Sequence, residues 1–130
     1  MLQQAPGLYF AASDIHGRGV FCAHALKKGD LIEICPVIVL PQEEIDMLTR
    51  SHLNGYYFAW GAAMDHAAIA LGFGSLYNHA IEPNAEFVPD YSDATIEFTA
   101  LKDIPAGEEI TVDYHAGAPH IKLWFTPLQD

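Results

Sequence analysis

Hydrophobic residues along the chain fall into short runs that are separated by glycine, proline and polar turn residues. Runs of this length, rich in branched and aromatic side chains, predict β-strands rather than helices. The strands are expected over residues 8–11, 20–23, 31–40, 56–60, 67–71, 85–88, 95–99 and 109–114. The pattern therefore predicts a mostly β protein.

Two segments depart from this simple pattern. Pro36 interrupts the longest run, and because proline cannot donate to a strand ladder, we expect two strand pieces or a bulged edge strand there. Residues 42–50 are the one good helix candidate, since Glu43 and Glu44 would lie in the first turn, where the helix dipole favours acidic groups. Helix should therefore be a minor component.

The length and composition indicate one globular domain. The chain has 130 residues, of which 51% are hydrophobic and 18% are charged. Its apolar runs are too short to cross a bilayer, and its first residues do not resemble a signal peptide, so we expect a soluble intracellular protein and no membrane partner. Cys22 and Cys35 lie inside strand-like runs, where we expect them to be small buried hydrophobes and not a disulfide.

The charge balance narrows the class of partner. Six Lys and Arg against seventeen Asp and Glu give a net charge of −11, which repels the phosphate backbone of nucleic acid. A basic partner would be attracted, although acidity that serves only solubility explains the same number. Direct binding of nucleic acid is therefore not expected.

Common catalytic motifs are mostly absent. The chain has no Gly-x-Ser-x-Gly elbow, no phosphate-binding glycine loop that ends in lysine, and no His-Glu-x-x-His. Its histidines are scattered, and Asp113 with His115 lacks further ligands at a recognisable spacing, so no bound metal is expected.

Three segments stand out. Gly17-Arg18-Gly19 lets the backbone turn sharply and approach a ligand, although a Gly-x-Gly alone is more often only a turn. Asn78 and His79 end an apolar stretch as adjacent polar side chains, which must find partners or meet a ligand; a turn cap and a satisfied core histidine are the structural alternatives. The segment 107–114 is an amphipathic strand that ends on a tyrosine, and alone it is an ordinary strand.

In this order, the three segments resemble the SET domain of protein-lysine methyltransferases. That family has a Gly-x-Gly near its start, an Asn-His-Ser-x-x-Pro-Asn-like segment, and a Gly-Glu-Glu-Ile/Leu-Thr-x-x-Tyr strand near its end. The resemblance runs from about Ile15 to Tyr114, and the short chain looks most like the minimal SET proteins of viruses and bacteria. It implies a single SET domain over residues 1–130, with a core over about 15–114, a flanking segment over 115–130, several short curved sheets and a C-terminal knot-like crossing.

The resemblance also implies a function. SET enzymes transfer a methyl group from S-adenosylmethionine to the side-chain amine of a lysine in a protein, and a histone tail is one candidate substrate. The positions that match the family's cofactor site are Gly17, Arg18, Gly19, Asn78, His79 and Tyr114, and Tyr114 also takes the catalytic role. Tyr56 or Tyr57 resembles the aromatic wall of the lysine channel, with Phe58, Phe87 and Val112 as further candidates.

Some features depart from the family pattern. Ala80 stands where serine usually follows Asn-His, and the cysteine-rich zinc segment that follows many SET domains is absent. Leu123-Trp124-Phe125 could cover the adenine, complete the channel or pack on the core.

Other functions stay open at this point. A catalytically inactive SET-like module that binds a lysine-rich partner is the main alternative, and a β-rich interaction protein unrelated to SET domains is another. The substrate is expected to be a basic, lysine-bearing protein or peptide, and a dimer is possible. The location would be the cytoplasm if the protein is bacterial, and the host nucleus is possible if it is viral or a secreted effector.

Overall fold

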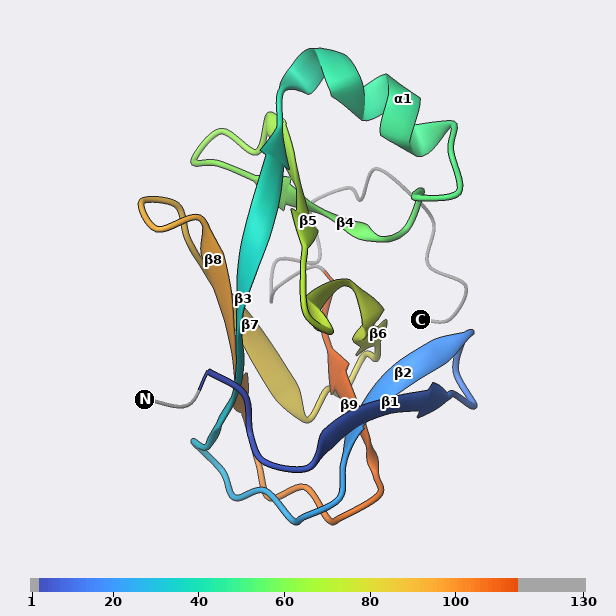
Figure 1. Cartoon of the computed structure of the whole chain (residues 1–130), viewed down its shortest axis with the longest axis vertical. Helices are drawn as coiled ribbons and strands as arrows, with labels where there is room; N and C mark the ends of the chain where they lie inside the picture. Colours follow the sequence, from blue (N-terminus) through green and yellow to red (C-terminus); the bar gives the residue numbers. More distant parts are fainter. Residues whose placement is uncertain (1–2, 115–130) are drawn as a thin grey trace.

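The computed structural model describes residues 3–114, which form two curved sheets joined by long loops (Figure 1). The strands are β1 Leu8–Ala12, β2 Arg18–Cys22, β3 Leu31–Leu40, β4 Tyr57–Trp60, β5 His66–Ala70, β6 Asn78–His79, β7 Ala85–Asp90, β8 Thr95–Ala100 and β9 Glu109–Val112. Each predicted strand overlaps an observed one, so the mostly β prediction is confirmed. The two-residue β6 was not predicted.

The smaller sheet has the strand order β1-β2-β9-β6. β1 and β2 form an antiparallel hairpin, and β9 pairs antiparallel with β2 and parallel with β6. Parallel neighbours need a long connection, which here runs through β7 and β8 of the other sheet. The late strand β9 therefore lies between two earlier segments, β2 and β6. The part of the predicted C-terminal crossing that follows Tyr114 lies outside the described residues, and so does Leu123-Trp124-Phe125.

The larger sheet has the order β4-β5-β3-β8-β7, which corrects the expectation for Pro36. β3 is one continuous strand in the middle of the sheet, and its bulge lies between Leu31 and Glu33, away from the proline. The first half of β3 pairs with β8 as far as Pro36, and the second half pairs with β5 from Val37. The proline is tolerated because it stands where the strand changes partners, so the nitrogen without a proton is not needed in either ladder.

The predicted helix is shorter than expected. Residues Gln42–Glu44 form a 3-10 turn (η1), and the α-helix α1 covers Ile45–Thr49; a second 3-10 turn, η2, covers Gly74–Leu76. α1 packs Leu48 against Tyr57 and Ala67 in a small separate cluster. Too few turns are present for a stable isolated helix, so this packing on β4 and β5 supports it.

The main core lies between the two sheets. It contains fully buried branched and aromatic residues from both of them, among them Val20, Ile32, Ile96, Phe98, Ile110 and Val112. Cys22 and Cys35 are buried in this core as free thiols, as predicted. Within residues 3–114, no helix is long and apolar enough to cross a membrane.

Candidate functional site

β6 brings the polar pair of the central motif next to the hairpin and to β9. Asn78 lies opposite Thr111 and His79 lies opposite Val112 in the parallel ladder, and both polar side chains are only 4% exposed. The strand of the third motif, β9, thus lies directly beside the Asn78-His79 pair of the second motif.

The Asn78 side chain joins the β1–β2 loop to β9. Its Nδ2 lies 3.0 Å from the carbonyl oxygen of His16, 3.3 Å from that of Arg18 and 2.8 Å from Oε2 of Glu109. Ser13 completes this group, because its hydroxyl lies 3.1 Å from Nδ2 and donates to Oε1 of Glu109 at 2.6 Å. Every one of these neighbours can accept a hydrogen bond, so the amide nitrogen must face the loop. We call Ser13, Asn78 and Glu109 the Asn78 network.

Glycine is needed at the two positions of the first motif for different physical reasons. A Cβ on Gly19 would collide with the Glu109 carboxylate and come within 3.2 Å of Asn78 Nδ2, so the network leaves no room for a side chain there. Gly17 has a φ of +52°, which residues with side chains rarely adopt. Among the described residues, no atom beyond its chain neighbours lies within 4 Å of the position its Cβ would take. The turn is therefore closed on the Gly19 side and open on the Gly17 side.

His79 positions the start of the segment after β9. Its Nδ1 accepts the backbone N–H of Tyr114 at 2.9 Å, which places the proton of the neutral ring on Nε2. The Asp113 carboxylate lies 3.8 Å from the same Nδ1, but a nitrogen that accepts a hydrogen bond carries no proton for an ion pair. We therefore describe His79 as a neutral acceptor for Tyr114.

Tyr114 lies against this pair. Its ring centroid is 5.0 Å from that of His79, and its hydroxyl donates to the carbonyl oxygen of Tyr77 at 2.9 Å. Burial raises the pKa of Tyr114 to about 12, and the neighbouring Tyr56 and Glu109 add to the rise because a second negative charge is unfavourable there. The phenol therefore stays protonated at physiological pH.

Asn84, the second asparagine of the central motif, has a structural role. Its Oδ1 accepts the backbone N–H of Thr111 at 2.8 Å, and its Nδ2 donates to the carbonyl oxygen of Glu109 at 2.9 Å. Both bonds go to the backbone of β9, which has β2 and β6 as its strand neighbours. Asn84 thereby fixes β9 from a further direction.

The predicted channel residues have different surroundings. Tyr56 is an electrostatic neighbour of Tyr114, whereas the Tyr57 hydroxyl lies 3.0 Å from Thr49 Oγ1 and faces α1. Phe58 packs against Phe87, with ring centroids 5.1 Å apart. Val112 is fully buried in the core. The arrangement favours Tyr56 over Tyr57 for the channel, and the channel itself stays a prediction.

The sequence did not identify Ser13, the Tyr77 carbonyl or the role of the Glu109 carboxylate as parts of this site. Glu109 was part of a recognised strand motif, but nothing in the sequence indicates that its carboxylate accepts a bond from an asparagine 31 positions earlier. Ser13 gave only a weak signal, a small polar residue shortly before the glycine turn.

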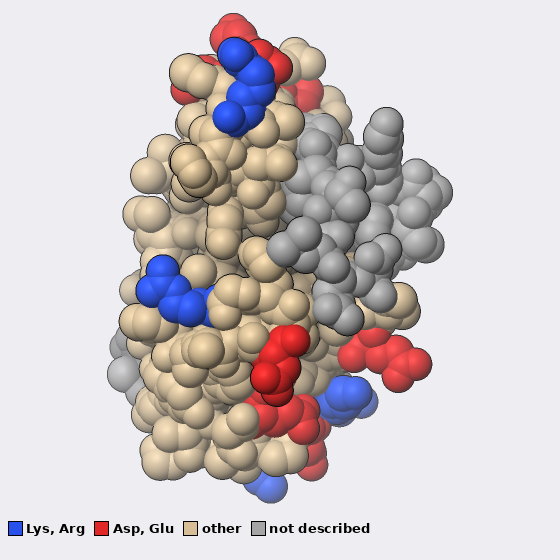
Figure 2. Space-filling model, turned by 90° about the vertical axis from the view of Figure 1, so that its right-hand side faces the viewer, with Lys and Arg blue, Asp and Glu red and all other residues tan. Residues whose placement is uncertain are grey.

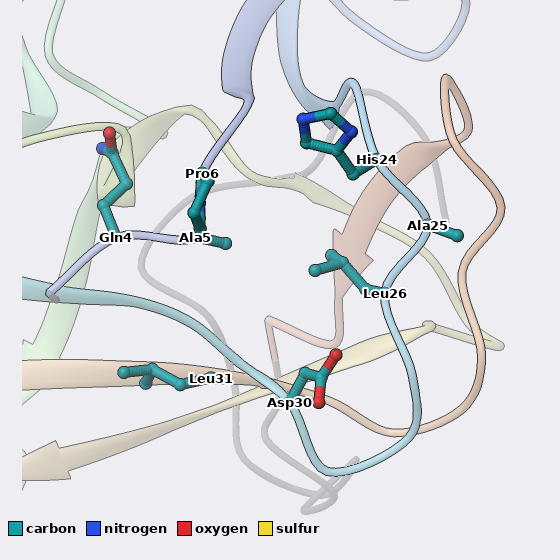
Figure 3. A pocket seen from close by; sticks show the side chains of 8 residues that line it. All are labelled: Gln4, Ala5, Pro6, His24, Ala25, Leu26, Asp30 and Leu31. Carbon is teal, nitrogen blue, oxygen red and sulfur yellow. The ribbon is translucent and has the colours of Figure 1, made fainter.

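A surface pocket of about 390 Å³ is lined by other residues (Figure 3). Its lining comes from the N-terminal segment and from the loop between β2 and β3, including Gln4, Leu26 and Asp30. It contains none of the predicted site residues. Within the described part of the chain, no group of three or more His, Cys, Asp or Glu side chains could hold a metal ion.

Comparisons with known proteins identify a family over most of the chain. The SET domain family matches residues 17–115. A Schizosaccharomyces pombe protein, the H3 lysine-37 specific histone-lysine N-methyltransferase, is 33% identical over 110 residues, which are 84% of this chain and 70% of that protein.

Solved structures share the fold. A candidate histone methyltransferase of Plasmodium falciparum superposes with a TM-score of 0.68 at 26% identity, over 95% of this chain and 98% of that one. A chain of a humanized mutant of Chaetomium thermophilum Polycomb Repressive Complex 2 superposes with a TM-score of 0.70 at 24% identity. This second match covers 87% of this chain and 15% of that one, and it shows the fold alone.

Proposed function

The chain belongs to the SET-domain family and is a protein-lysine methyltransferase, and from this premise we propose that it uses S-adenosylmethionine to methylate a lysine in a basic, histone-type segment. The observation that supports this most strongly is the meeting of the three motifs. The Asn78 amide contacts the backbone of the glycine turn, while His79 accepts the N–H of Tyr114. Segments that are far apart in sequence thus form one site.

The residues at this site fit the cofactor. The carbonyl oxygens of His16 and Arg18 and the Glu109 carboxylate form an acceptor-rich, negatively charged wall, which suits the ammonium group of an amino-acid moiety. The open space beside Gly17 leaves room for a ligand to approach the backbone. We propose that Gly17, Arg18, Gly19, Asn78 and His79 hold S-adenosylmethionine. When bound, the cofactor supplies a methyl group on a positively charged sulfur, which a neutral amine can attack.

Tyr114 is the proposed catalytic residue. Its pKa of about 12 means that it is not a base at neutral pH, and its proton is directed at the Tyr77 carbonyl. The phenolic oxygen can then accept a hydrogen bond from an N–H of the incoming amine and orient that amine. Because free lysine has a pKa of about 10.4, the amine must lose a proton before transfer, and an apolar aromatic wall favours the neutral form. Tyr56, Phe58 and Phe87 are the proposed wall.

The substrate class is proposed from charge and from the relative. The net charge of −11 favours a basic partner, and the Schizosaccharomyces pombe relative is named for a lysine of histone H3. On the face that carries the hairpin, acidic side chains gather in the lower part of the molecule, beside a few basic ones (Figure 2). Asp14 in the β1–β2 loop and Glu108 before β9 are both exposed. A lysine-rich segment would be attracted to such a surface.

The test is a methyl-transfer assay with purified protein, radiolabelled S-adenosylmethionine and recombinant histone H3, with mass spectrometry to locate the modified lysine. Calorimetry with the cofactor alone runs in parallel. Cofactor binding with transfer to a histone lysine is the expected result. Peptide binding without any cofactor heat would instead identify an inactive module, and cofactor binding with transfer only to an acidic or neutral protein would contradict the substrate class.

A further inference from the structure

Glu33 is a buried carboxylate that the proposed site does not use. It lies on β3, is 3% exposed, and accepts hydrogen bonds from the Tyr77 hydroxyl at 2.8 Å and from the backbone N–H of Phe73 at 3.1 Å. The side-chain amide of Gln4 donates to it as well, at 3.1 Å. A buried charge is costly unless hydrogen-bond donors surround it. The three donors to Glu33 therefore offset the cost of burying its carboxylate.

Two of the partners of Glu33, Phe73 and Tyr77, belong to the segment that leads into β6. Gly72 has a φ of +63°, and a Cβ there would collide with Oε2 of Glu33. A Cβ on Gly74 would come within 2.9 Å of Cys35 Sγ, also on β3. The segment from Gly72 to Tyr77 is therefore pressed against β3, with no room for side chains at its two glycines, and it ends one residue before Asn78.

Tyr77 connects this buried carboxylate to the catalytic tyrosine. Its ring is stacked on Phe98 with centroids 4.2 Å apart, and its hydroxyl donates to Glu33. Its own backbone carbonyl accepts the hydrogen bond from the Tyr114 hydroxyl at 2.9 Å. The ring stack and the bond to Glu33 fix the two ends of the Tyr77 side chain, which limits how far its carbonyl can move.

We propose that Glu33 is a positioning residue for methyl transfer: it holds Tyr77, and Tyr77 in turn directs the hydroxyl of Tyr114. This rests on the proposed function, in which that hydroxyl orients the amine. The Tyr114 ring also contacts His79 and its backbone N–H bonds to His79 Nδ1, so loss of the Glu33 bond should leave the ring in place and misdirect the hydroxyl. A small error in the position of a reacting group is enough to slow an enzyme.

The protonation states of Tyr77 and Cys35 agree with a hydrogen bond donated by Tyr77 to Glu33. Burial, together with the charge of Glu33, raises the pKa of Tyr77 well above its ordinary value, so its phenol remains a donor at any working pH. Burial and Glu33 also raise the pKa of the Cys35 thiol, which therefore adds no negative charge beside the carboxylate. The order of donation is thus Tyr77 to Glu33 and Tyr114 to Tyr77.

The test is a double-mutant cycle on kcat with Tyr77→Phe and Tyr114→Phe, measured at saturating S-adenosylmethionine and histone H3. Tyr77→Phe removes one hydroxyl and keeps the stack on Phe98, so it should fold, and Glu33→Gln gives a second variant of similar volume. We expect Tyr77→Phe and Glu33→Gln each to lower kcat by about threefold to tenfold, with the cofactor Kd changed less than about twofold. In the Tyr114→Phe background neither change should lower kcat further.

The cycle separates positioning from stability. Tyr77→Phe should lower the Tm equally in both backgrounds, whereas its effect on kcat should disappear when Tyr114 has no hydroxyl. Tyr91→Phe, an exposed tyrosine beside Trp60, is the matched control and should leave kcat unchanged.

Two results would overturn the inference in different ways. Additive losses in kcat, or a Tyr77→Phe variant with lower Tm and normal kcat, would show that Glu33 is only structural while leaving the role of Tyr114 intact. A Tyr114→Phe variant with the wild-type kcat would refute the proposed function of Tyr114, and the inference with it.

Discussion

Asn78→Asp is the most informative change at the proposed cofactor site, because it keeps the shape of the side chain and replaces a hydrogen-bond donor with a negatively charged acceptor. In the wild type, the amide nitrogen lies 2.8 Å from the Glu109 carboxylate and close to two backbone carbonyls. One oxygen of a carboxylate in its place would face the Glu109 carboxylate and these carbonyl oxygens. Two unit charges at this separation repel by about 6 kcal/mol at an effective dielectric constant of about 20.

The expected cost is smaller than this repulsion, because one proton can be shared between the two carboxylates. We expect a loss of about 3 kcal/mol at neutral pH, equivalent to a fall in Tm of about 10 °C for a domain of this size. The pKa of the new carboxyl is raised in the folded variant above its unfolded value of about 3.9. The variant should therefore be nearly as stable as the wild type at pH 4 and should lose stability as the pH rises through the raised pKa.

The assays are thermal melts from pH 4 to pH 8 and calorimetry with S-adenosylmethionine at a temperature where the variant is folded. We expect the cofactor Kd to rise at least tenfold, because the oriented amide is lost. Asn84→Asp is the matched control: it also places a carboxylate beside a glutamate, with Nδ2 of Asn84 3.2 Å from Oε2 of Glu108, but it lies outside the proposed cofactor site. It should lower the Tm and leave the Kd unchanged. Equal effects of the two variants on Kd, or a pH-independent loss of Tm in Asn78→Asp, would refute the reasoning.

Four further outcomes are expected. Tyr114→Phe should lower methyl transfer about tenfold or more with little change in cofactor affinity, and a radiolabel assay that finds the wild-type rate would remove this residue from the catalytic role. Gly19→Ala should destabilise the protein by about 1–3 kcal/mol, since a methyl group there collides with Glu109, and a denaturant titration with an unchanged midpoint would contradict this. The KM for a lysine-rich peptide should rise with ionic strength, and an indifferent KM would return the acidity to a role in solubility alone. Chelators should change neither activity nor Tm, and stoichiometric zinc by elemental analysis would overturn that expectation.

Much of the fold was predictable because its strands are short apolar runs bounded by turn residues. β1 and β3 are such runs, β8 alternates apolar and polar residues, and all three were placed closely. β6 was missed since two polar residues show no period, and only the parallel pairing with β9 makes them a strand. Pro36 was expected to split the run into two strand pieces or to mark a bulged edge strand, by a rule that treats one ladder at a time, but β3 is one strand that changes partners at that residue.

The order of motifs along the chain was enough to predict the family, the proposed cofactor residues and Tyr114, because each motif is local and its residues are adjacent. The bonds between the motifs could not be predicted in this way. Glu33 reads as one acidic residue in a strand, and its burial follows only from the tyrosine hydroxyl and backbone N–H that reach it from residues 73–77. Ser13, Asn78 and Glu109 likewise come from three segments. Their contacts depend on β9 lying between β2 and β6. The tertiary structure decides this long-range pairing, because β6 and β9 are joined by a stretch of chain that folds into the other sheet.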